Sequence, residues 1–468
     1  MGDQDDEKLP PIRVPLSLRQ QEIWDWLAQW PKAAGFYNDT IRVTLAGRPS
    51  VDLVRQVLDF VVERHEPLRT TFHEDGEGTY QSIGPTVEFD VPFVDLTSLP
   101  PAERDVELQR LLVAQNAEPL DLRTGPPFRV ALYKTGDNAC ELAITLQHII
   151  SDQTTDSILY GELLEAHAAF ARGEKPDLPT LPIQFADFAI WERQWLTEDR
   201  LREGCDYWRA QLRGMPLDVD LPCDRPRRHD GDKRTSGIDF FVPPDVHAGL
   251  DRLTRDTSST LFIVFVAAAQ CLLARCTGET DAVVLTTFHG RDRRELEGMM
   301  GIFAGAALLR SDLSGDPTFR QVVDRARGAV LGMLEHQFVP FDTVVDAVVA
   351  DLRAQGVDAF PQVPLSIEFF HAPRGRLLSG MSLIERRPDV EGHVSAESAD
   401  IDDIINPLAF RIFGGDQLWG RLSYHDAVFD QATVEHTVAD FKALLSVVSV
   451  DPGVRLSALP VGAVREAV

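Results

Sequence analysis

The amino-acid sequence predicts a mixed α/β (α+β) fold divided into two subdomains. Its 468 residues exceed the roughly 100–200 residues of a typical single domain. Segments in which apolar residues alternate, as in strands, are interleaved with segments in which apolar residues recur at helical spacing. Both halves of the chain contain segments of both kinds. Prolines interrupt this pattern at residues 176–182. We therefore expect one subdomain over residues 1–178 and a second over residues 179–468.

The first half is predicted to contain a strand, a helix, a hairpin and a second helix in that order. Apolar residues alternate over 41–45, and Ser50 then precedes apolar residues at helical spacing, which is typical of a helix N-cap. Alternating segments over 128–132 and 142–146 are joined by a Gly-Asp-Asn turn and predict the hairpin. We expect the second helix over residues 154–171.

The second half contains predicted elements of the same kinds. We expect helices over 261–276, 319–335 and 431–447, and a Ser-Ser-Thr sequence precedes the first of these as a cap. Strands are expected over 281–288, 363–370, 408–413 and 418–424. Residues 374–405 are charged and irregular, and a loop of that length is either functional, mobile or disordered.

The composition excludes several classes of function. The chain has 46 Lys and Arg residues against 73 Asp and Glu residues, a formal net charge of −27. Such an acidic surface repels phosphate groups, so we expect neither nucleic-acid binding nor docking on an anionic membrane. The first ten residues lack the order of a signal peptide, and the longest apolar run, 261–269, is about half a membrane span. We therefore expect a cytoplasmic protein.

Common catalytic and metal-binding motifs are absent from the sequence. The five cysteines form no Cys-x-x-Cys pair, which argues against a zinc site or a disulfide framework. The sequence contains no Gly-x-Ser-x-Gly, phosphate-binding loop or His-Glu-x-x-His motif. Residues 414–417 have a glutamine where a carrier-protein attachment site needs serine. The basic segment 225–229 is either a solvated loop or a docking patch for an acidic partner.

The most suggestive residues follow the second strand of the predicted hairpin, in Gln147-His148-Ile149-Ile150-Ser151-Asp152-Gln153. Strand parity places His148 on the face of Leu146, with Gln147 on the other face. An imidazole here can accept a proton from an attacking amine or hydroxyl, or it can be a core histidine bonded to backbone. Asp152 is either a base or a buried carboxylate, and a buried carboxylate needs a cation beside it.

This segment resembles the His-His-x-x-x-Asp-Gly motif of nonribosomal peptide synthetase condensation domains. Arg64-His65-Glu66-Pro67-Leu68-Arg69-Thr70-Thr71-Phe72 resembles the family's Arg-His-Glu-x-Leu-Arg-Thr-x-Phe segment. Further matches follow the family's order, at residues 17–24, 185–191, 207–209, 290–291, 301–303 and 336–341.

The resemblance implies two chloramphenicol-acetyltransferase-like subdomains in a V-shaped pseudo-dimer, the first of which carries the active-site motif. A tunnel between them would receive 4′-phosphopantetheine arms that peptidyl or acyl carrier proteins deliver, and the domain would bind no cofactor or metal of its own. His148 matches the histidine that acts as base or orienter. Asp152 matches an aspartate that pairs with an arginine, and Arg291 stands at the matching position. A monomer fits the family.

Three positions depart from the family pattern. Gln147 replaces the first histidine, whose role is mainly structural, and an amide can keep hydrogen bonds there. Gln153 replaces a glycine beside the tunnel, where a side chain narrows the passage. Gly305 stands where an asparagine is usual, which removes a polar group from the tunnel. With Ser151, the last two residues are the predicted tunnel lining.

Three functions are consistent with the sequence. An active condensation enzyme, free-standing or part of a larger synthetase, would join a carrier-bound acyl or aminoacyl thioester to a small-molecule or carrier-bound acceptor and form an amide or ester. A catalytically degenerate relative would instead recruit a tailoring oxygenase or a carrier protein. An acyltransferase of the same superfamily would use a soluble or coenzyme-A-linked substrate.

Overall fold

The computed structural model of the chain forms two compact units. The first contains residues 1–197, 289–304 and 378–387, and the second contains residues 198–288, 305–377 and 388–468. Within these, the structure describes residues 11–462 apart from 32–34, 36, 47–49, 218, 220, 227–234, 358–362, 372–380, 384–391, 397–406 and 416. The predicted boundary between residues 178 and 179 stays a prediction. The first unit differs from the predicted first subdomain because it also includes residues 179–197, 289–304 and 378–387.

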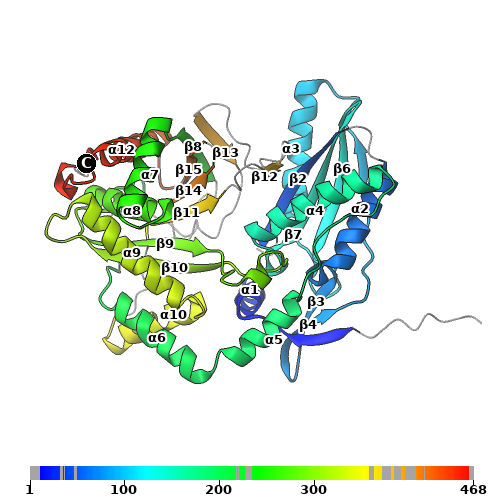
Figure 1. Cartoon of the computed structure of the whole chain (residues 1–468), viewed down its shortest axis with the longest axis horizontal. Helices are drawn as coiled ribbons and strands as arrows, with labels where there is room; N and C mark the ends of the chain where they lie inside the picture. The colour runs from blue at the N-terminus through cyan, green and yellow to red at the C-terminus, as the bar shows by residue number, and fades with distance from the viewer. Residues whose placement is uncertain are drawn as a thin grey trace, which may run out of the picture. The chain divides into compact units, whose positions relative to one another are not determined.

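A five-stranded sheet forms the centre of the first unit, in the order β12-β2-β7-β6-β5 (Figure 1). Its strands are β2 (Asn38–Ala46), β5 (Phe93–Asp95), β6 (Phe128–Gly136), β7 (Ala139–Gln147) and β12 (Met381–Leu383). Neighbouring strands are antiparallel except for β5 and β6. The predicted first strand and hairpin are therefore confirmed.

Helices cover both faces of this sheet because the apolar residues of β7 alternate between them. Leu142, Ile144 and Leu146 pack into the core on the side of α2 (Val51–Arg64) and α4 (Gln153–Ala171). Ala143 lies in the smaller cluster on the other side, with residues of α3 (Pro101–Ala117). The Oγ of Ser50 accepts a hydrogen bond from Leu53 N at 3.0 Å, so the predicted cap of α2 is confirmed.

The remaining elements of the first unit surround this layer. A three-stranded antiparallel sheet has the order β1-β4-β3. The elements are β1 (Ile12–Pro15), α1 (Leu18–Gln29), β3 (Thr70–Asp75), β4 (Gly78–Ile83), α5 (Phe185–Trp195) and 3₁₀ turns at Glu66–Arg69, His148–Ile150 and Arg294–Leu296.

The second unit is built on a seven-stranded sheet in the order β10-β9-β11-β14-β15-β8-β13. Its strands are β8 (Thr235–Phe241), β9 (Asp281–Phe288), β10 (Gly305–Asp312), β11 (Leu365–His371), β13 (Gly392–Ala396), β14 (Leu408–Gly414) and β15 (Trp419–His425). Its helices are α6 (Glu198–Leu212), α7 (Pro244–Asp256), α8 (Leu261–Thr277), α9 (Phe319–Glu335), α10 (Phe341–Ala354), α12 (Gln431–Val450) and a 3₁₀ turn at Leu456–Ala458.

The sequence predictions for the second half agree with these elements to within a few residues. The helix predicted over 261–276 is α8, which begins after its N-cap Thr260 and lies almost entirely inside the core. No single helix among the described residues meets the length and composition of a membrane span. One pair, 244–257 with 261–277, meets them together but is bent by 103°. Most of the predicted loop over 374–405 lies outside the described residues, but its described part forms β12 and β13, so the prediction of a wholly irregular segment was wrong. The predicted mixed α/β fold is confirmed.

Candidate functional site

The predicted motif lies in the turn that joins β7 to α4. β7 ends at Gln147, one 3₁₀ turn follows over His148–Ile150, and α4 begins at Gln153. Because β7 ends before His148, strand parity does not determine the direction of the His148 side chain. The prediction that His148 lies on the same face as Leu146 was therefore wrong. The side chain is set instead by the 3₁₀ turn and by the residues around it.

Gln147 keeps a hydrogen bond at the position of the family's first histidine. Its side chain is buried, and its Oε1 accepts a hydrogen bond from Ile149 N at 2.5 Å, which caps the 3₁₀ turn. Its Nε2 is buried without a hydrogen-bond partner among the described residues. The amide therefore supports the turn through its oxygen.

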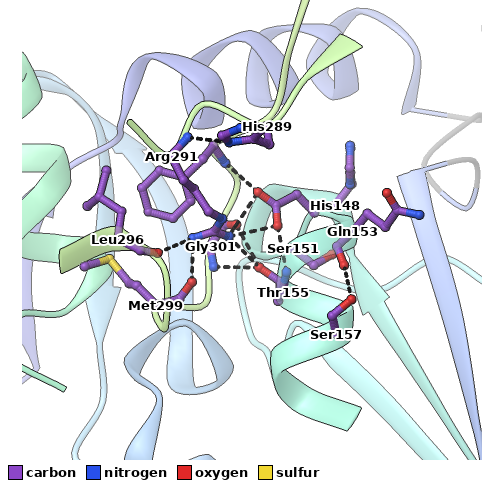
Figure 2. A network of polar contacts seen from close by, with 12 residues as sticks. His148, Ser151, Gln153, Thr155, Ser157, His289, Arg291, Leu296, Met299 and Gly301 are labelled. Atoms are coloured by element: carbon purple, nitrogen blue, oxygen red, sulfur yellow. Dashed lines mark hydrogen bonds and ion pairs between the residues drawn. The ribbon is translucent and has the colours of Figure 1, made fainter. Parts of the chain in front are cut away.

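Asp152 organises the other end of the turn. Its buried carboxylate caps α4 by accepting a hydrogen bond from Thr155 N at 2.8 Å, and Phe303 N donates to it at 3.1 Å. The Nη2 of Arg291 lies 2.9 and 3.1 Å from its two oxygens (Figure 2). The structure thus brings together the two residues that the sequence analysis paired, and the cation offsets the cost of burying the carboxylate.

Arg291 also ties the segment 289–304 to the turn. Its Nη1 donates to the carbonyl oxygens of Leu296 and Met299 at 2.8 and 2.7 Å, and its guanidinium lies 4.1 Å from the centre of the Phe303 ring. Burial lowers the pKa of Arg291 and the charge of Asp152 raises it, with a net decrease. The ion pair is therefore one part of a network that fixes where α4 begins.

Gly301 brings its backbone close to this network. Thr155 Oγ1 donates to Gly301 O at 2.9 Å and accepts from Gly301 N at 3.0 Å (Figure 2). Gly301 has a φ of +148°, and a Cβ there would overlap the ring of Phe185. Glycine adopts this positive φ without strain and leaves room for the Phe185 ring. Any other residue would be strained and would displace that ring.

We expect Gly301→Ala to lower the free energy of unfolding by about 1–3 kcal/mol, the usual cost of overpacking a core. Urea denaturation measures the change. Gly76→Ala is the matched control, because a Cβ at Gly76 meets nothing within 4 Å. Equal stability of the two variants would contradict the prediction.

His148 is presented differently from Asp152, because 31% of its side chain remains exposed. Its Nδ1 is buried and lies 3.4 Å from Oδ2 of Asp39, which is in β2. The ring stacks on Tyr37, with centroids 5.9 Å apart and planes 16° from parallel. Since Nδ1 is buried, the exposed surface belongs to the rest of the side chain, which carries Nε2.

The charges around His148 favour its protonated form. Burial alone would lower the pKa of His148, but the close contact and charge of Asp39, the charge of Asp152 and the backbone of Ser151 together raise it above the usual value. The neutral imidazole needed for a base is therefore populated at a higher pH than in a free histidine.

Sequence reasoning missed two carboxyl groups near this histidine, Asp39 and Asp156. Asp156 lies in the first turn of α4, is 4% exposed, and has a buried Oδ1 without a hydrogen-bond partner among the described residues. Burial first, and then the charges of Asp39 and Asp152, raise its pKa well above the usual value. The register of β2 against β7, which pairs Asn38 with Gln147 and Asp39 with Leu146, places Asp39 beside the motif.

The condensation domain family model matches residues 13–462. This chain belongs to the condensation domain family. One of the linear gramicidin synthase proteins of Brevibacillus parabrevis is 33% identical over 447 residues, which are 96% of this chain but 9% of that protein. The chain therefore spans a small part of this much longer relative. His148, Asp152 and Arg291 lie in segments in which the sequence resembles the family motifs, whereas Asp39 and Asp156 do not.

Solved structures show the same fold. The X-domain in a complex with OxyB from teicoplanin biosynthesis has a TM-score of 0.76 and 26% identity, with 96% of both chains covered. The first condensation domain of the calcium-dependent antibiotic synthetase, in complex with a substrate analogue, has a TM-score of 0.74 at 19% identity, with 96% and 99% covered. The fold is therefore the chloramphenicol-acetyltransferase-like fold of condensation domains.

The residues predicted to line the tunnel have different surroundings in this condensation domain. The Ser151 side chain is buried and its Oγ donates to Gln147 O at 3.3 Å. Gln153 is half-buried as the first residue of α4. Gly305 begins β10 of the second unit, opposite Phe288. The assignment of these three residues to a tunnel stays a prediction.

The basic segment is only partly described. Arg225 donates to a carboxylate oxygen of Asp430 at 2.7 Å and to the carbonyl oxygens of Asp426, Ala427 and Phe429. Its guanidinium therefore already has partners within the second unit. Residues 227–234 lie outside the described part of the chain, as does residue 416 of the Gly-Gly-Asp-Gln segment.

Proposed function

We propose that this condensation domain is active and joins a carrier-bound acyl or aminoacyl thioester to an amine or hydroxyl acceptor. One observation carries the proposal: part of the His148 side chain is exposed, while its Nδ1 is buried beside Asp39. A histidine held in this way can accept a proton at Nε2. Membership of the condensation domain family supports the reaction class.

In the proposed reaction, the acceptor nitrogen or oxygen bonds to the carbonyl carbon of the donor thioester. The carbon–sulfur bond breaks, and the proton lost by the acceptor passes through Nε2 of His148 to the departing sulfur. The products are an amide or ester and the free thiol of the 4′-phosphopantetheine arm. That arm belongs to the carrier protein, which is a substrate and partner in this proposal. Much of the rate would come from holding both reactants at one site.

The direct test is to incubate the protein with an acyl-loaded carrier protein and paired acceptors that differ only in an amine or a hydroxyl. Mass spectrometry detects the amide or ester and the freed carrier thiol. Product formation above the rate without protein is the expected result. Transfer from coenzyme A thioesters alone would instead indicate an acyltransferase with soluble substrates, and no product with any donor would contradict the proposal.

A second candidate function is the recruitment of a tailoring oxygenase. Two observations favour it: the similarity to the X-domain solved with OxyB, and the glutamines at positions 147 and 153 of the motif. Pull-down of OxyB and other tailoring oxygenases by the immobilised chain tests this function. Binding of an oxygenase by a chain that forms no product would support recruitment. Product formation without such binding would support condensation.

Gln153 gives a separate test of the substrate passage. We expect Gln153→Ala and Gln153→Gly to lower the KM for the loaded carrier several-fold, about 2- to 5-fold, because both remove the side chain predicted to narrow the passage. Gln153→Gly should also cost up to about 1 kcal/mol of stability at a helical position, whereas Gln153→Ala should not. An unchanged KM in both variants would show that Gln153 does not restrict the donor.

A further inference from the structure

The surroundings of His148 contain a carboxylate that neither the motif nor the ion pair with Arg291 accounts for. Asp39 lies in β2, one residue from the Asn38–Gln147 pair at the end of the two strands. Its Oδ2 lies 3.4 Å from the buried Nδ1 of His148. This distance is within the range of an ion pair, but Nδ1 makes no hydrogen bond to any described residue in this structure. Hydrogen bonds to catalytic histidines often form or tighten only when substrate binds.

We propose that Asp39 is a positioning residue for His148, which keeps a proton on Nδ1 and thereby leaves Nε2 to accept the proton of the acceptor. The inference rests on the proposed condensation function and assigns a residue to it. A carboxylate beside one ring nitrogen of a histidine selects the tautomer in which that nitrogen carries the proton. It also stabilises the imidazolium that forms when Nε2 accepts a second proton.

The other acidic groups near His148 do not fill this role. The carboxylate of Asp152 is already bound by Arg291, Thr155 N and Phe303 N. Asp156 is buried, and its raised pKa keeps it protonated over a wider pH range. The Asp39 side chain is 54% exposed, so water can solvate its charged form.

Tyr37 completes the arrangement from the same part of the first unit. It stacks on the imidazole of His148, and its own ring lies edge-on to Trp26, with centroids 4.7 Å apart and planes at 80°. Tyr37 thus restricts the plane of the imidazole, while Asp39 defines which edge of the ring faces the protein. Since Nδ1 is buried and 31% of the side chain is exposed, we take Nε2 as the ring nitrogen that meets the acceptor.

The test measures the tautomer and the pKa of His148 by ¹⁵N NMR of the imidazole, with His148→Gln used to assign its signals. Asp39→Asn removes the charge but keeps a carbonyl acceptor, and Asp39→Ala removes both. Asp90→Asn is the matched control, because it removes one negative charge at an exposed position of the same unit. Asp156→Asn replaces the buried carboxyl of Asp156 by an amide of the same shape.

We expect the pKa of His148 to fall in Asp39→Asn and Asp39→Ala, and to stay as in the wild type in Asp90→Asn and, near neutral pH, in Asp156→Asn. The Nδ1–H tautomer should persist in Asp39→Asn and be lost in part in Asp39→Ala. The acidic limb of the pH–rate profile should move to lower pH in Asp39→Asn, with kcat reduced about 10-fold and KM nearly unchanged.

Two results would overturn the proposal. The first is that the pKa and the tautomer of His148 are unchanged in both Asp39 variants. The second is that Asp90→Asn shifts the pKa of His148 as much as the Asp39 variants do, which would reveal a general charge effect. The NMR measurement does not require turnover. If the wild type forms no product but the Asp39 variants change the tautomer and pKa as expected, the condensation function fails while the positioning role stands.

Discussion

Replacing His148 by alanine is expected to lower kcat for amide or ester formation by about 10²- to 10⁴-fold, the usual contribution of a general acid–base group. In the proposed mechanism Nε2 of His148 accepts the acceptor's proton. Quenched-flow product analysis with a loaded carrier measures the effect. Because the ring is partly exposed and contacts chiefly Asp39 and Tyr37, the variant should keep nearly the stability of the wild type.

His73→Ala is the control for this experiment. His73 lies in β3 of the same unit, where its Nε2 shares a hydrogen bond with Thr71 Oγ1 and its ring stacks on Tyr80. We assign it no part in the reaction. Activity of His148→Ala within a factor of about two of the wild type would remove this residue from the mechanism. Loss of activity together with a large fall in melting temperature would show that His148 has a structural role.

Local patterns predicted several elements with apolar periodicity or a clear cap, but not α1, which begins at a capping box, or α7 and α10, whose buried residues recur at helical spacing. α2 follows the Ser50 cap, and the hairpin of β6 and β7 alternates between two covered faces. α3 was missed because only Leu108, Leu112 and Gln115 of its residues are buried, so it carries little helical periodicity. The strands β1, β3 and β4 were also missed, and so were the longer strands β8 and β10.

The sequence predicted only those site residues that lie in contiguous motifs. The motif predicted His148 and Asp152, and the match of positions 290–291 to the family added Arg291, which lies 139 residues from its partner. Asp39 and Asp156 belong to no motif, and their proximity to His148 depends on the register of β2 against β7 and on where α4 begins. Such proximity is a tertiary property, which local periodicity does not contain.

The buried ion pair provides the largest expected effect on stability. Arg291→Met leaves the carboxylate of Asp152 buried without its cation. Asp152→Asn leaves the guanidinium of Arg291 without its anion, but it keeps an oxygen that can cap α4. Each single variant should lower the free energy of unfolding by about 3–5 kcal/mol, because an unpaired buried charge is retained. Urea denaturation monitored by more than one probe measures the loss and tests for separate transitions of the two units.

The double variant Asp152→Asn with Arg291→Met separates the lost pairing from the lost packing. It removes both charges, so it should be more stable than the sum of the single losses predicts, by about 1–3 kcal/mol of coupling. Arg110→Met is the matched control, because Arg110 pairs with Glu107 on an exposed helix face, where water screens the pair and its loss should change stability little. Additive losses in the double variant would mean that Asp152 and Arg291 act through their separate hydrogen bonds. The start of α4, and with it the turn that carries His148, would then not depend on their ion pair.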